Sequence, residues 1–192
     1  MMLQIRPALV LLALFTALTG VAYPLLVTAL AQVLMPGLAN GSLVHSGDKV
    51  VGSSLIGQPF ADPRHFWSRP SATAPFPYNA AASSGSNLGP LSDALVANVK
   101  ARVDALRRAD PGNTAAIPID LVTSSGSGLD PHISVAAARW QIGRVARARA
   151  LPVDAIEELI LRHTEGRQLG FLGEPRVNVL EVNVALDATG TL

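Results

Sequence analysis

The hydropathy pattern begins with one long uncharged stretch. No charged residue stands between positions 6 and 48, and residues 7–35 contain a single strongly polar side chain, Gln32. At about 1.5 Å per residue, a helix over residues 7–35 is more than long enough to cross a hydrocarbon core of about 30 Å. We therefore predict one transmembrane helix here. A kink is expected at Pro24, which has no N–H and leaves the carbonyl of Gly20 without its helical donor.

The charges on either side of this stretch predict its orientation. Arg6 and the terminal amine precede the helix, whereas the segment after it is neutral as far as Asp48. Cytoplasmic flanks of membrane helices carry the excess of Lys and Arg. We therefore predict a cytoplasmic N-terminus at residues 1–6, the transmembrane helix at residues 7–35, and an extracytoplasmic (periplasmic) domain at residues 36–192.

A cleaved signal peptide is the alternative interpretation of the same stretch. The tripeptide Ala29-Leu30-Ala31 resembles a small-residue cleavage site, and Arg6 supplies a weak positive n-region. The apolar stretch is, however, about twice as long as that of an ordinary signal peptide, which favours an anchor. Cleavage after Ala31 would instead release a stand-alone periplasmic binding module.

Small residues recur four positions apart on the predicted anchor, as Ala13 with Ala17 and Thr16 with Gly20. This spacing allows a second membrane helix to approach closely, so these four residues are candidates for helix packing. Alanine and glycine are also simply common in membrane helices, and this second explanation stays open.

Behind the anchor, periodic apolar positions predict three helices. They cover residues 91–109, residues 134–149, and a segment that starts at Pro152 and stops near Gly166. Their expected inner faces are Leu95, Val99, Val103 and Leu106; Val135, Ala138, Ile142 and Val145; and Val153, Ile156, Leu159 and Ile160. On the second helix, four arginines are expected away from the inner face: Arg139, Arg144, Arg147 and Arg149.

The remaining segments predict strands and an ordered loop. Residues 49–60 are typical of one or two short strands interrupted by glycine, and the valine-rich residues 176–186 are typical of a strand with a bulge. Residues 62–79 contain too many prolines for regular structure and are expected to form a loop packed by its aromatic rings. We predict a mixed α/β (α+β) domain with about three helices and a small sheet.

Two similar loops precede the first two of these helices. Residues 83–90 and 124–131 share six of eight aligned residues. If their glycines are present for backbone geometry, we expect positive φ at Gly85 and Gly126. The loops are either glycine-rich turns with serine caps or sites whose backbone N–H groups bind an anion or a partner. The candidate contact residues are Ser84, Gly85, Ser86, Asn87, Ser127, Gly128, Asp130 and His132.

The composition and the absence of known motifs argue against most classes of enzyme. The chain has 15 basic and 14 acidic residues, which argues against a nucleic-acid partner, and it has no cysteine. Neither lysine follows a glycine, so no Walker A loop exists, and no Gly-x-Ser-x-Gly elbow is present. The four histidines have no metal-ligand spacing. His132 beside Asp130 lies at a helix entrance where Asp130 and Ser134 are expected as caps, so we favour capping over ligation there. We predict no catalytic residue, no metal site and no self-sufficient enzyme.

Several motifs together resemble the C subunit of the Kdp potassium-transporting ATPase, in order along nearly the whole chain. They are Arg6-Pro7-Ala8 and Tyr23-Pro24-Leu25 in the anchor, then Leu55-Ile56-Gly57-Gln58, Arg69-Pro70-Ser71-Ala72-Thr73, Ser83 to Pro90, Gly126 to Ser134, His163-Thr164-Glu165-Gly166-Arg167, and Gly173 to Val179. One small departure is Ser125, where alanine is expected.

The resemblance implies a non-catalytic subunit of an inner-membrane potassium pump in bacteria. Its implied partners are a channel-like potassium-translocating subunit, a P-type ATPase subunit and membrane lipid. ATP and potassium ion are then ligands of the complex, and the C subunit supports assembly and raises the ATP affinity of the catalytic subunit. A domain outside the membrane cannot touch cytoplasmic ATP, so this effect is expected to pass through subunit contacts. The alternative is a cap over the potassium entrance.

Overall fold

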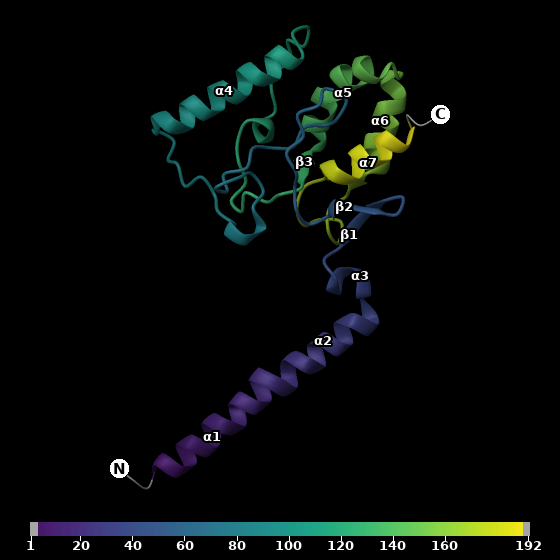
Figure 1. Ribbon diagram of the computed structural model, residues 1–192. Coiled ribbons are helices and arrows are strands. Elements are labelled where there is room, and N and C mark those ends of the chain that lie inside the picture. The colour runs from purple at the N-terminus through teal and green to yellow at the C-terminus, as the bar shows by residue number, and fades with distance from the viewer. Residues whose placement is uncertain (1–3, 190–192) are drawn as a thin grey trace. The chain divides into compact units, whose positions relative to one another are not determined.

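The computed structural model describes residues 4–189. The chain divides into two compact units, and the division falls between Leu43 and Val44 (Figure 1). Residues 1–3 of the predicted cytoplasmic N-terminus lie outside the described residues.

The first unit is dominated by one apolar helix. It comprises α1 (Ile5–Ala17), a π-helical turn (Leu18–Ala22) and α2 (Tyr23–Leu34), and it is followed by the short helix α3 (Pro36–Ala39). The continuous helix Ile5–Leu34 has 30 residues, and the mean hydropathy of its most apolar 18-residue segment is 2.2. It is therefore long and apolar enough to cross a membrane. The π turn directly precedes Pro24, which lies in the first turn of α2. The wider turn is where the helix accommodates the missing N–H of the proline.

The second unit contains two small antiparallel sheets. Strands β1 (Leu43–Ser46) and β2 (Lys49–Ser53) form a two-stranded ribbon. The other sheet has the order β3-β5-β4, with bounds His132–Ser134, Arg176–Asn178 and Thr164–Glu165. Residue Val177 of the central strand pairs with Ile133 on one side and with Thr164 on the other.

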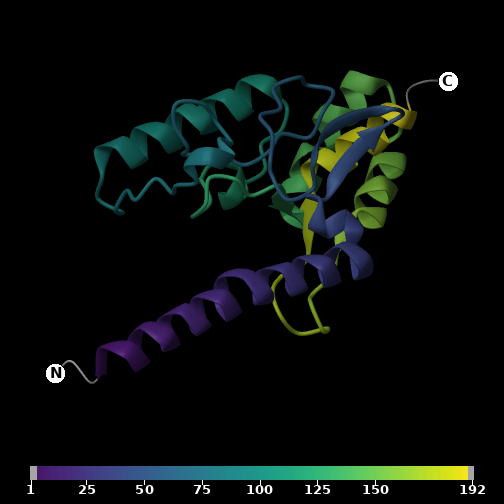
Figure 2. The same ribbon diagram turned by 60° about the horizontal axis from the view of Figure 1, so that its bottom comes forward.

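Four helices complete this unit: α4 (Asp93–Ala109), α5 (Val135–Arg149), α6 (Val153–Arg162) and α7 (Val179–Thr189). Figures 1 and 2 both show α5, α6 and α7 gathered beside the three-stranded sheet, with α4 extending away from them. The mixed fold, with helices and small sheets behind one long apolar helix, agrees with the fold class predicted from the sequence.

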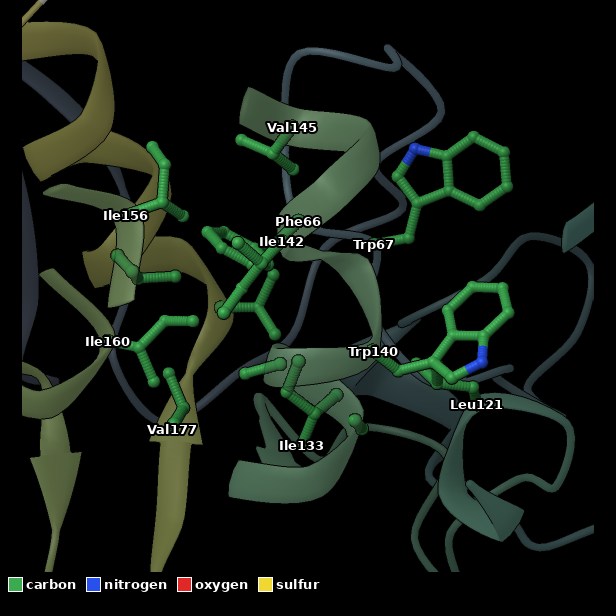
Figure 3. Close-up of a cluster of buried hydrophobic side chains, with 14 of the residues drawn as sticks. Phe66, Trp67, Leu121, Ile133, Trp140, Ile142, Val145, Ile156, Ile160 and Val177 are labelled. Carbon is green, nitrogen blue, oxygen red and sulfur yellow. The ribbon is translucent and has the colours of Figure 1, made fainter. Parts of the chain in front are cut away.

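The core forms where α5 and α6 meet the sheet and the proline-rich loop (Figure 3). Among its fully buried side chains are Phe66 from that loop, Val145 from α5, Ile160 from α6 and Val177 from β5. The loop is held by hydrogen bonds as well as rings: Gln141 on α5 accepts from the N–H of Trp67 at 2.8 Å. The prediction of an ordered loop packed by aromatic rings is confirmed.

The predicted strand over residues 176–186 is wrong beyond Asn178, because the chain continues as helix α7. The side chain of Asn178 accepts a hydrogen bond from the N–H of Glu181 at 3.2 Å, as a helix N-cap does. Val179, Val182 and Leu186 are buried along one face of the helix. Asn178 and Glu181 have the Asn-x-x-Glu spacing that is typical of a helix start. The prediction gave more weight to the valines of this segment, which favour a strand.

Two predictions about helix faces are also wrong. Val153 is the first residue of α6 and has 55% of its surface exposed, whereas the buried residues of this helix are Ile156 and Ile160. Arg144, expected away from the inner face of α5, is 97% buried, with only 3% of its surface exposed. The carbonyl groups that surround it in the proline-rich loop explain how a charged residue is accommodated there.

Candidate functional site

The two loops that resemble each other in sequence lie against each other in space. The N–H of Ser84 and the hydroxyl of Ser83 both donate to the carbonyl of Ser127, each at 3.0 Å. A Cβ added at Gly85 would lie 2.9 Å from the carbonyl oxygen of Gly126, closer than real side chains approach. The candidates Ser84, Gly85, Ser127 and Gly128 are thus brought together, which their distance in sequence did not reveal.

Positive φ occurs at one equivalent position in each loop, Asn87 (51°) and Gly128 (67°). The prediction of positive φ at Gly85 and Gly126 is wrong. Gly85 is needed for the close approach of the two backbones, and nothing lies within 4 Å of a Cβ added at Gly126. Asparagine tolerates the left-handed region better than most residues with a side chain. This explains why one loop has Asn87 at the position where the other loop has Gly128.

A third segment, from the proline-rich loop, holds the second of these loops. The hydroxyl of Ser71 donates to the carbonyl of Gly128 at 2.6 Å and accepts from the N–H of Tyr78 at 2.9 Å. The phenol of Tyr78 donates to the carbonyl of Arg69 at 2.5 Å, and burial raises the pKa of this phenol. The loops therefore form part of a fixed, hydrogen-bonded surface.

A charged cluster begins where the second loop ends. Arg69 pairs with Asp130 at 2.8 Å, and Asp130 accepts from the backbone N–H of His132 at 3.0 Å. The His132 ring lies 3.2 Å from Glu165, which also pairs with Arg176. The expected capping role is correct for Ser134, whose hydroxyl accepts from the N–H of Ala137 at 3.0 Å, but wrong for Asp130, which precedes strand β3. Arg69, Glu165 and Arg176 were missed as members of this cluster.

The electrostatics of the cluster are set by these pairs. Burial by itself raises the pKa of Asp130, but hydrogen bonds from His132 and Arg69 outweigh it and lower this pKa to about 2. For Glu165, burial again opposes the hydrogen bonds from Arg176 and His132, and the net effect lowers the pKa. Within residues 4–189, no three His, Cys, Asp or Glu side chains are placed to hold a metal ion. The cluster is a set of paired charges.

Two cavities adjoin these features. One of about 480 Å³ lies over the charged cluster, and its polar lining includes Arg69, Asp120, Asp130, His132, Glu174 and Arg176. Asp120 also accepts from the N–H of Ser134 at 2.7 Å, which fixes the cavity wall to the start of α5. The other, of about 440 Å³, lies between α4 and the loops and contains the candidate Ser86.

The candidate helix-packing residues belong to the other unit. Ala13, Thr16 and Ala17 lie on α1 and Gly20 in the π turn, all of them exposed in the described structure. A Cβ added at Gly20 would lie 4.0 Å from the methyl group of Thr16, in ordinary contact. The stripe therefore has room for a larger residue within its own helix.

We expect the charged cluster to make folding sensitive to acid. The pKa of Asp130 is lowered from 3.8 to about 2, so the stabilisation that its charged form provides is present above pH 4 and is lost as the pH falls from about 4 to about 2. Because the side chain is partly open to solvent, which screens its ion pairs, we expect this loss to be about 1 kcal/mol. Urea unfolding measured across this range should show the loss. Asp130→Asn should unfold more easily near neutrality and show a flatter acid dependence; an unchanged acid dependence would contradict the assignment.

Comparison with known proteins places these features in context. Residues 5–188 match the family model described as "KdpC: K+-transporting ATPase, c chain". Curated relatives named "Potassium-transporting ATPase KdpC subunit" include one from Methylococcus capsulatus, 64% identical over 95% of this chain and 96% of its own length. Another from Variovorax paradoxus is 64% identical over 96% of both chains, and one from Sorangium cellulosum is 63% identical over 97% of this chain and 98% of its own.

Proposed function

Because the chain belongs to the KdpC family, the c chain of K+-transporting ATPases, we propose that it is the accessory subunit of an ATP-driven potassium uptake pump. The observation that carries this proposal is the match over residues 5–188, which includes the apolar helix as well as the second unit. In this role the chain contributes no catalytic residue. It supports assembly with a channel-like potassium-translocating subunit and a P-type ATPase subunit.

We further propose that the chain raises the ATP affinity and turnover of the catalytic subunit indirectly. ATP and potassium ion then bind at the level of the complex. The hydrogen-bonded loops around Ser84 and Ser127 and the charged cluster around Asp130 supply a surface of fixed shape for a partner subunit. A rigid contact surface favours one conformation of a partner at little entropic cost, which is one physical route to such coupling.

The stand-alone periplasmic module is the weaker alternative. Its release requires cleavage after Ala31, yet the family match begins at residue 5, upstream of that position. Retention of the apolar helix in the mature chain, measured by mass spectrometry of the purified protein, would support the subunit.

The proposed location is the bacterial inner membrane, with a single pass, a cytoplasmic N-terminus and a periplasmic domain. Because the chain has no cysteine, Asp104→Cys on the exposed face of α4 introduces a single thiol. We expect this thiol to react with a membrane-impermeant reagent in intact spheroplasts. Reaction only after lysis would place the domain in the cytoplasm and would allow direct contact with ATP.

Assembly through the anchor is tested at Gly20. Gly20→Leu places a bulky side chain on the small-residue stripe, and the loss of close helix packing is expected to cost about 1–2 kcal/mol. Less complex should be recovered through a tag on a partner subunit. Leu11→Ala, on the face of α1 opposite the stripe, is the control and should leave recovery unchanged. Equal recovery of the Gly20 variant and the parent would show that the stripe faces lipid.

A further inference from the structure

The loop between β4 and β5 exposes a cluster of apolar side chains that the described residues of the second unit, up to position 189, leave uncovered. Leu169 is 83% exposed, Phe171 67% and Leu172 48%. No charged residue occurs from Gln168 to Gly173. Figure 2 shows this yellow-green loop extending beyond the strands that it joins. Single exposed apolar residues are ordinary, but three within four positions mark an interaction surface.

The backbone of this loop is ordered by its own hydrogen bonds. Gln168 and Leu172 exchange both N–H···O bonds at 2.9 Å, and Gly170 takes a φ of +82° at the tip. At the base, Arg167 pairs with Glu174 at 2.8 Å. The loop thus holds its apolar side chains outward with little entropy left to lose on binding, which is the arrangement expected of an insertion element.

We propose that the apolar tip, Leu169 to Leu172, inserts into the lipid headgroup and acyl boundary and is a second attachment of the chain to the membrane. Phe and Leu are the side chains that amphipathic segments bury at this boundary, and the absence of charge between Gln168 and Gly173 removes the main cost of entering it. The apolar tip is also much smaller than the roughly 20–30 residues that each partner contributes to a standard protein interface.

The length of the linker supports this occupant. The chain from Leu34, where the apolar helix ends, to Val44 spans at most about 35 Å when fully extended. A domain tethered so closely to a bilayer meets it at high effective concentration, so a small insertion element suffices. The inference rests on the proposed function only in that the apolar helix must span the membrane. It does not depend on a partner subunit.

The test uses the full chain alone, reconstituted in vesicles of phosphatidylethanolamine and phosphatidylglycerol. Three single-cysteine variants carry an environment-sensitive fluorophore: Phe171→Cys in the apolar tip, Leu91→Cys at a 96% exposed position before α4, and Leu12→Cys in the anchor. Quenching is measured with iodide in water and with spin-labelled lipids.

We expect the Phe171 label to emit at shorter wavelength, to be quenched by labelled lipid, and to be quenched by iodide several-fold less than the Leu91 label. The Leu12 label should be quenched by lipid alone. When Leu169→Asp and Leu172→Asp are added to the Phe171→Cys variant, iodide should quench the label as strongly as it quenches the Leu91 label, and labelled lipid should no longer quench it.

Three outcomes would overturn the proposal. If the Leu12 label is quenched by lipid while the Phe171 label is quenched by iodide as strongly as the Leu91 label, the insertion is wrong and the anchor stands. If the Leu12 label also escapes labelled lipid, the anchor fails and the insertion fails with it. If the Phe171 label is shielded from both quenchers, the apolar tip is covered by protein and not by lipid, and the insertion is wrong.

Discussion

Replacing Arg144 with alanine is expected to lower the free energy of unfolding by about 3–5 kcal/mol, because several buried polar groups lose their partner at once. The guanidinium donates to the carbonyls of Pro63 and His65 at 2.5 and 3.0 Å and to the side chain of Gln141 at 2.6 Å. It also lies 4.7 Å from the centre of the Trp67 ring. Burial lowers the pKa of Arg144 to about 10, which still leaves it charged near neutrality.

The same helix supplies the matched control. Arg139 is exposed and pairs with Glu157 at 2.7 Å, so Arg139→Ala should cost less than about 1 kcal/mol. Urea unfolding can be followed by fluorescence, since both tryptophans of the chain, Trp67 and Trp140, lie in the core. Equal losses in the two variants would mean that the carbonyls around Arg144 find other partners.

Gly128→Ala is expected to lower the free energy of unfolding by about 2–5 kcal/mol. An alanine at φ +67° carries a conformational cost of about 1–2 kcal/mol. Its Cβ would also lie 2.6 Å from the carbonyl oxygen of Ser84 and 2.7 Å from the methyl group of Thr73, and relief of such overpacking costs about 1–3 kcal/mol more. The measurement is again urea unfolding of the full chain.

Gly126 is the control for this substitution because it lies two residues away in the same loop. A Cβ there meets nothing within 4 Å and φ is not in the left-handed region, so Gly126→Ala should change the free energy of unfolding by less than about 1 kcal/mol. If the two alanines cost the same, contact between the loops does not determine which glycine is needed.

The sequence was sufficient to predict features that depend on neighbours along the chain. The helices α4, α5 and α6 repeat apolar residues at the helical period and end near proline or glycine, so their positions were predicted to within a few residues. The long apolar helix was predicted because an uncharged apolar stretch of this length is typical of a membrane-spanning helix. Helix α7 was not predicted because its valines favour a strand, and the helix-capping role of Asn178 was not recognised.

The features that the sequence could not predict depend on distant partners. Arg69 reaches Asp130 across 61 positions, and Arg144 reaches the carbonyl of Pro63 across 81. A charged residue on an amphipathic helix is normally assigned to the water-facing side, because the groups that would satisfy it in the core are not visible in its own segment. The similarity of the two loops identified the candidate residues, but only the fold brings Ser84 to Ser127.

The position of β5 at the centre of its sheet has a consequence for the time at which the domain folds. Both neighbouring strands, β3 and β4, precede β5 in the chain and pair only with it. The side chain of Asn183, later still, donates to and accepts from the backbone of Phe66 in the proline-rich loop. A nascent chain therefore cannot form its three-stranded sheet or close this loop until its last segment has been synthesised.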